Sequence, residues 1–142
     1  MTGSTRFPFV ATDPSQPVAS LMPMLPFTLV NGESQISVSG LLDTGSSVNV
    51  LPRSAGEQLG FVWDQQRSAI TLTGNMAHVP ARGIIVTAKI ASFPPVRLAF
   101  AWAGGDEVRL ILGQANFFME FDVCFFRSLA EFELAPSAES TR

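Results

Sequence analysis

Residues 41–52 read Leu-Leu-Asp-Thr-Gly-Ser-Ser-Val-Asn-Val-Leu-Pro, so a single carboxylate, that of Asp43, lies between two apolar stretches. The leucines before it and the valines and leucine after it are typical of two buried strands joined by a tight loop. Gly45 is expected to give this loop backbone angles that a residue with a Cβ would resist. The sequence therefore predicts a strand, a loop that presents Asp43, and a second strand.

The length and composition of the chain indicate one domain that associates with a second copy. Its 142 residues suffice for one domain with a real core but are too few for two lobes. Hydrophobic residues make up 46% and charged residues only 15%, with 12 Phe and no Tyr. This apolar surface exceeds what one small fold can bury, and a subunit interface is the simplest place for the excess.

The charge pattern and the single cysteine argue against several classes of protein. The net charge is −3 without a cluster of Lys or Arg, which gives little support to nucleic-acid binding. The only cysteine, Cys124, cannot form an internal disulfide, and its apolar neighbours predict a buried, inert thiol in a cytoplasmic protein. We expect no membrane span, because no segment has ~18 uninterrupted apolar residues. We expect no metal or cofactor, because no His, Cys or acidic cluster has ligand spacing.

The distribution of prolines and polar residues divides the chain into three parts. Residues 1–23 carry four prolines among Ser and Thr, which predicts an extended N-terminal arm. Residues 24–134 are expected to form the domain itself. Residues 135–142 are expected to form a polar tail.

The predicted elements of the domain are mostly strands. An Asn-Gly pair at 31–32 between alternating runs predicts a hairpin whose second strand leads into Asp43. A second hairpin is predicted around a polar segment at 74–80. Further strands are predicted at 95–102, 108–112, 122–126 and 130–134, with a short turn or helix at 52–60 and a helix at 114–121. The order predicts a small, closed, barrel-like all-β domain with one short C-terminal helix.

These features together resemble the retropepsin-like aspartic proteases, the single-lobe, homodimeric family that includes the retroviral enzymes. The resemblance covers about residues 24–134 and rests on three features in order. They are the loop at 42–46, a hairpin that begins some thirty residues later, and the run Leu110-Ile111-Leu112-Gly113 followed by Gln114-Ala115-Asn116. Seventy residues separate Asp43 from Gly113, which leaves room for a hairpin and two or three strands.

The resemblance implies an acid protease fold, active as a homodimer on a peptide or protein substrate, without a cofactor or metal. It implies that Asp43 is the catalytic residue. Supporting residues of the active-site loop would be Thr44, Gly45 and Ser46. The element that braces this loop would contain Ile111, Leu112 and Gly113. A flap over the substrate would contain Thr73, Gly74, Asn75 and Met76.

The chemistry of this family explains why one copy of the motif matters. It needs two carboxylates within hydrogen-bonding reach, one ionised to activate water and one protonated to polarise the scissile carbonyl. A chain with one such Asp therefore implies that two chains combine. The family's loop threonines, here Thr44, bond to each other across the dimer axis. The hydroxyl of Ser46 is expected to donate to the Asp43 carboxylate and favour its charged form.

The chain departs from the retroviral pattern at two places. Retroviral enzymes usually carry an acidic residue four positions after the catalytic Asp, paired with an Arg directly after the glycine of the later element. This chain has Ser47 and Gln114 at those positions, where a neutral hydrogen bond could replace the ion pair. Its C-terminus is also longer and rich in Phe, which indicates a different dimer sheet.

Three alternative functions compete with the protease. A non-catalytic dimerisation or peptide-binding module would keep the fold without cleavage, although the intact Asp43-Thr44-Gly45 argues against it. An Asp-x-Gly-Ser-Ser run also resembles the first phosphate loop of sugar kinases and actin-like ATPases, whose fold needs far more chain. A Ser-His-Asp triad using His78 has no nucleophile-elbow glycine pattern.

Overall fold

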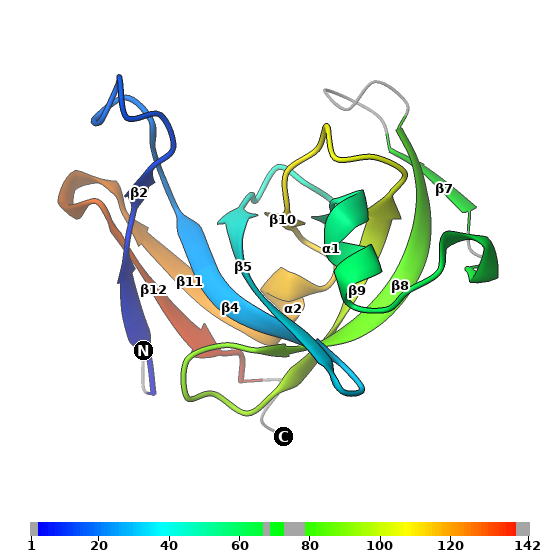
Figure 1. Ribbon diagram of the computed structural model, residues 1–142. Coiled ribbons are helices and arrows are strands. Elements are labelled where there is room, and N and C mark those ends of the chain that lie inside the picture. The colour runs from blue at the N-terminus through cyan, green and yellow to red at the C-terminus, as the bar shows by residue number, and fades with distance from the viewer. Residues whose placement is uncertain (1–2, 67–68, 73–78, 139–142) are drawn as a thin grey trace.

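A seven-stranded sheet and a three-stranded sheet lie beside each other in the computed structural model, which describes residues 3–66, 69–72 and 79–138 (Figure 1). The larger sheet has the order β4-β5-β10-β6-β9-β8-β7, and β4 also pairs with β8. Six strands therefore close into a barrel, and β7 extends it at one edge. The predicted small, closed, all-β architecture is confirmed.

The strands of the barrel sheet are β4 (Met24–Asn31), β5 (Ser34–Leu42), β6 (Asn49–Leu51), β7 (Ala69–Leu72), β8 (Val79–Lys89), β9 (Val96–Ala103) and β10 (Ile111–Leu112). The three-stranded sheet contains β1 (Thr5–Pro8), β12 (Glu131–Pro136) and β11 (Phe121–Phe126) in that order. A small ribbon pairs β2 (Val10–Ala11) with β3 (Leu21–Met22). The helices are α1 (Arg53–Gln58) and α2 (Phe117–Glu120), with 3₁₀ turns at Trp63–Gln65 and Arg127–Leu129.

The hairpin of β4 and β5 forms where the Asn-Gly pair predicts it. The two strands pair antiparallel from Met24 opposite Leu41 to Asn31 opposite Ser34. Gly32 takes a φ of +60° in the turn, which costs a glycine little. Alternate residues of β4 point into the barrel, so Leu25, Phe27 and Leu29 are at most 6% exposed.

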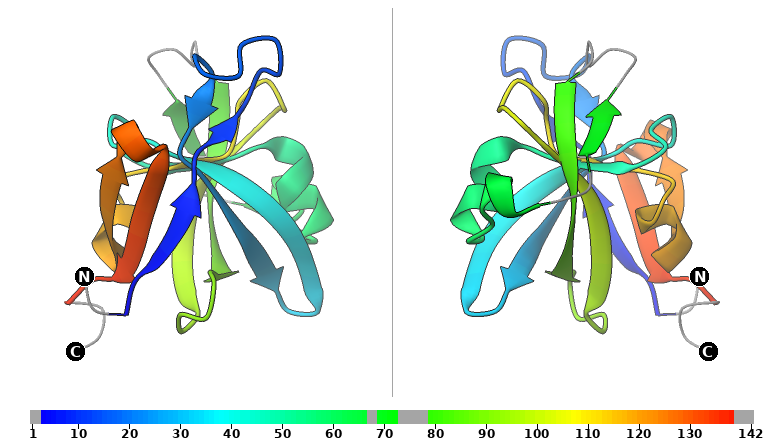
Figure 2. Two further views of the ribbon diagram at one scale, coloured as in Figure 1. Left: turned by 90° about the vertical axis from the view of Figure 1, so that its left-hand side faces the viewer. Right: turned by 90° about the vertical axis from the view of Figure 1, so that its right-hand side faces the viewer.

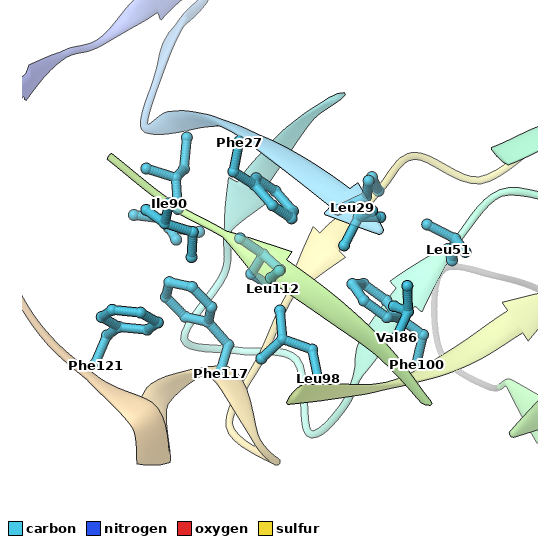
Figure 3. Close-up of a cluster of buried hydrophobic side chains, with 14 of the residues drawn as sticks. Phe27, Leu29, Leu51, Val86, Ile90, Leu98, Phe100, Leu112, Phe117 and Phe121 are labelled. Atoms are coloured by element: carbon cyan, nitrogen blue, oxygen red, sulfur yellow. The ribbon is translucent and has the colours of Figure 1, made fainter. Parts of the chain in front are cut away.

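The core of the barrel is one large apolar cluster, in which side chains from β4, β6, β8, β9 and β10 meet Phe117 of α2 and Phe121 (Figure 3). Burial of each such side chain contributes about 1.5–3 kcal/mol. A second, smaller cluster joins β6 and β10 to the base of the β7–β8 hairpin. Its buried members are Val50, Leu72, Val79, Ala81, Ala101, Ala103 and Ile111.

Two predicted elements are shorter than the sequence indicates. The helix expected over 114–121 covers only Phe117–Glu120, and the amides of Gln114 and Ala115 before it donate to the carbonyls of Ser46 and Ser47. The strand expected over 108–112 pairs only at Ile111 and Leu112.

The N-terminal segment is part of the sheet structure in its described residues. β1 pairs antiparallel with β12, and β12 pairs antiparallel with β11. The prediction of a buried Cys124 is wrong, because this residue is exposed on β11. Its apolar neighbours Val123 and Phe125 point to the opposite face, since side chains alternate along a strand.

Helices able to cross a membrane are absent from the described residues, since none is both long and apolar enough. The same residues contain no group of three or more His, Cys, Asp or Glu side chains that could hold a metal ion.

Candidate active site

Asp43 directly follows β5, at the start of the loop that leads to β6 (Figure 1). Its side chain is half-buried, and its Oδ1 accepts a hydrogen bond of 2.9 Å from the N–H of Gly45. Its backbone carbonyl accepts from the N–H of Ser46 at 3.1 Å. Within the part of the chain that the structure describes, Oδ2 has no hydrogen-bond partner. The loop therefore fixes one carboxylate oxygen and leaves the other available.

Gly45 has a different role from the one predicted. Its φ is not positive, so the loop does not need the backbone freedom of a glycine there. A Cβ at this position would lie 3.2 Å from Oδ1 of Asp43, which is tighter than most real contacts. Glycine therefore provides space beside the carboxylate.

Thr44 and Ser46, two of the hydroxyl residues of the loop, lie in different surroundings. Thr44 is exposed at the surface of the chain. Ser46 donates to the backbone carbonyl of Val48 at 2.7 Å, so the expected bond to the Asp43 carboxylate is not formed. The hydroxyl of Ser46 therefore closes the loop onto its own backbone.

A second segment, residues 110–116, is hydrogen-bonded to the loop and to the end of β5, and we call it the brace. The N–H of Leu41 donates to the carbonyl of Leu110, and the N–H of Asp43 donates to that of Leu112, both at 3.0 Å. β10 pairs parallel with β5 and antiparallel with β6, where Ile111 lies opposite Val50. The brace thus lies between the strands that enter and leave the Asp43 loop. Ile111, Leu112 and Gly113, predicted as its bracing residues, are all buried.

Gly113 lies where the brace crosses the loop. A Cβ on it would stand 2.4 Å from the carbonyl oxygen of Val48 and 2.7 Å from that of Ser46. Both distances are far below any real contact, and both neighbours are backbone atoms. Only glycine allows the two segments to approach this closely.

Gln114 supplies a neutral hydrogen bond at the position where the retroviral pattern has an Arg. Its Nε2 donates to the backbone carbonyl of Thr44 at 2.8 Å, and its backbone N–H donates to the carbonyl of Ser46 at 2.9 Å. The partner of the side chain is therefore the loop backbone. The backbone N–H of Ala115 donates to the carbonyl of Ser47 at 2.9 Å.

Sequence analysis missed two residues of this site, Asn49 and Asn116. Asn49 is fully buried and accepts a hydrogen bond from the N–H of Gly113 at 2.8 Å. It also donates to Oδ1 of Asn116 at 3.1 Å. The available signal was the polar residue in the apolar run Val48-Asn49-Val50, since a polar side chain inside a buried strand requires specific partners.

The base of the predicted flap is formed by β7 and β8. These strands pair antiparallel, with Leu72 opposite Val79 as the outermost described pair. The flap candidates Thr73, Gly74, Asn75 and Met76, and also His78, lie outside the described residues.

Comparisons with known proteins agree with this geometry. Residues 26–115, more than half of the chain, match the family model described as aspartyl protease. No curated protein shows significant similarity to the chain. Its fold is similar to the crystal structure of a retropepsin-like aspartic protease from Rickettsia conorii, with a TM-score of 0.65 and 18% identity over 92% of this chain and 90% of that chain. The chain therefore belongs to the aspartyl protease family and has the retropepsin-like fold.

Proposed function

We propose that the chain is an aspartic endopeptidase whose active site combines two Asp43 carboxylates, one from each subunit of a homodimer. The observation that carries this proposal is the state of the Asp43 side chain. Its Oδ1 is held by the N–H of Gly45, and its Oδ2 has no partner among the described residues. A half-exposed carboxylate fixed in this way is suited to share a proton with a second copy and to bind a water molecule.

The reaction follows from this pairing. Two carboxylates within hydrogen-bonding reach of each other cannot both ionise, so the pair holds one proton. The ionised member takes a proton from the bound water, whose oxygen attacks the peptide carbonyl, while the protonated member donates to the carbonyl oxygen. Collapse of the tetrahedral intermediate breaks the C–N bond, and the amine leaves with a proton from the pair.

The dimer would use the face on which the Asp43 loop and β11 lie. In Figure 2 the loop after β5 and the three-stranded sheet lie on the same side of the molecule, and α1 lies on the other side. β11 is an edge strand of that sheet, whereas the opposite edge, β1, contains Pro8, which lacks an N–H for pairing. Near this face Met119, Phe125 and Leu129 are 66%, 40% and 62% exposed. These apolar side chains suit burial against a second copy.

Substrate would lie between this loop and a flap. We propose that Thr73, Gly74, Asn75 and Met76 close over the bound peptide, because they connect the paired strands β7 and β8. The small apolar cluster at the base of this hairpin includes Val50 and Ile111, the neighbours of the Asp43 loop.

The test is the variant Asp43→Asn, assayed with a mixed peptide library between about pH 4 and pH 7, where an acid dyad is active. Asp13→Asn is a matched control, because Oδ1 of Asp13 also accepts from a backbone N–H two residues ahead, that of Ser15 at 3.0 Å. We expect Asp43→Asn to remove cleavage and Asp13→Asn to retain it. Equal cleavage by both variants would refute the assignment. A dimer that binds peptides without cutting them would indicate the non-catalytic module instead.

A further inference from the structure

Two asparagine side chains connect the brace to the barrel. The amide of Asn49 uses both of its donors and one of its acceptor positions. Its Nδ2 donates to the carbonyl of Ala99 at 2.9 Å and to Oδ1 of Asn116 at 3.1 Å, while its Oδ1 accepts from Gly113. Asn116 in turn accepts from the N–H of Ala99 and donates to the carbonyl of Arg97, both at 3.1 Å. The two amides thus fasten the brace at Gly113 and at Asn116 onto β9.

The bond from Gly113 to Asn49 acts on the peptide group that also holds Asp43. The N–H of Gly113 and the carbonyl of Leu112 belong to one planar peptide unit. That N–H donates to Oδ1 of Asn49 at 2.8 Å, and that carbonyl accepts from the N–H of Asp43 at 3.0 Å. A rigid unit held at one side cannot rotate at the other. The orientation of the Asn49 amide is therefore transmitted to the backbone of Asp43 through a single peptide group.

We propose that Asn49 is a positioning residue for Asp43 and fixes the carboxylate through the Leu112–Gly113 peptide. This inference rests on the proposed function. Gly113 has no Cβ, so the side chain of this residue cannot restrain the peptide, and the restraint comes from hydrogen bonds. Asn49 is 0% exposed, so water cannot replace its amide when it is removed. Its loss removes one of the two hydrogen bonds that hold this peptide unit and loosens the acceptor of the Asp43 amide.

The test compares Asn49→Leu with the control Asn31→Leu. Asn31 also donates from Nδ2 to a buried carbonyl, that of Leu59 at 2.8 Å, but it lies at the far end of β4. We expect Asn49→Leu to lower kcat at least about tenfold with KM within about threefold of the wild type, because a small misplacement of a reacting group is costly. Asn31→Leu should leave both constants unchanged.

A second readout does not depend on cleavage. Amide hydrogen exchange of Asp43, relative to the slowest amides of β9, should accelerate about tenfold in Asn49→Leu and remain unchanged in Asn31→Leu. If Asn49→Leu does not fold, the same two measurements use Asn116→Ala. This variant removes three hydrogen bonds of a partly exposed side chain, and we expect the same changes in kcat and in amide exchange.

The outcomes separate this inference from the proposed function. A folded variant with wild-type kcat and wild-type protection of Asp43 would overturn the positioning role. If the wild-type protein cleaves no peptide, the proposed function fails. The exchange measurement then still decides whether Asn49 fixes the Asp43 loop.

Discussion

Replacement of Gly113 by Ala tests the brace most directly. The new Cβ would stand 2.4 Å from the carbonyl oxygen of Val48, whereas ordinary contacts begin at 3.4 Å, so the loop and the brace must separate by about 1.0 Å. The bonds of 2.9 Å from Gln114 to Ser46 and from Ala115 to Ser47 would then lengthen to about 3.9 Å and be lost.

The energetic cost follows from these two effects. Overpacking of a tight site costs about 1–3 kcal/mol, and two lost hydrogen bonds cost about 1 kcal/mol each. We therefore expect Gly113→Ala to lower the free energy of unfolding by about 3–5 kcal/mol. A shift of about 1 Å at the Asp43 loop should also reduce kcat about a hundredfold.

Urea unfolding and peptide cleavage measure the two quantities, with Gly32→Ala as the control. Gly32 has a φ of +60°, and a Cβ added to it would meet nothing within 4 Å, so its replacement adds backbone strain of about 1 kcal/mol without a clash. Full activity is expected in that variant. If Gly113→Ala lost no more stability than Gly32→Ala, the steric account of the crossing would be wrong.

Three further predictions concern Ser46, Trp63 and Asp106. Ser46→Ala should leave the acidic limb of the pH-rate profile unmoved and lower the free energy of unfolding by about 1 kcal/mol, because the hydroxyl donates to the carbonyl of Val48. A shift of that limb would show that the hydroxyl contacts Asp43. Trp63→Leu should lower the free energy of unfolding, measured in urea, by about 2 kcal/mol, because the guanidinium groups of Arg53 and Arg82 lie over its ring, 4.7 Å and 4.6 Å from the ring centre. Trp63→Phe should retain part of this stabilisation. Asp106 accepts from the backbone N–H and the hydroxyl of Ser54, which lowers its pKa below the ordinary 3.8. A carboxylate whose pKa is lowered in the folded state stabilises the fold above pH 3.8, and this stability is lost as the pH falls through the folded-state pKa. The urea midpoints of the wild type and Asp106→Asn should therefore differ at pH 7 and converge in acid.

Local sequence patterns were sufficient to predict the strands of the barrel and the Asp43 loop, but not the strands β1, β2 and β3 of the N-terminal segment. The Asn-Gly turn after β4 and the alternation along that strand are set by neighbouring residues, so they can be read from a short window. The loop is also recognisable, because an acidic residue between two apolar runs has few structural explanations.

The partners of polar side chains could not be predicted in the same way. The hydrogen bond of Gln114 depends on which carbonyl lies nearest after the barrel closes, and it reaches Thr44 across seventy positions of sequence. The exposure of Cys124 depends on which face of β11 packs on the core. Asn49 was overlooked because its partners, Gly113, Asn116 and Ala99, come from two other segments.

The dependence of the Asp43 loop on a distant segment also determines how it can move. Loop residues from Leu41 to Ser47 bond to Leu110, Leu112, Gln114 and Ala115, so the loop cannot form before a long connection has closed. Its opening therefore requires the brace to leave the barrel, which approaches global unfolding. β7, in contrast, is an edge strand that pairs only with β8. The Asp43 loop is thus held more firmly than the edge strand β7, and denaturant should release the β7–β8 pairing before it changes the geometry of Asp43.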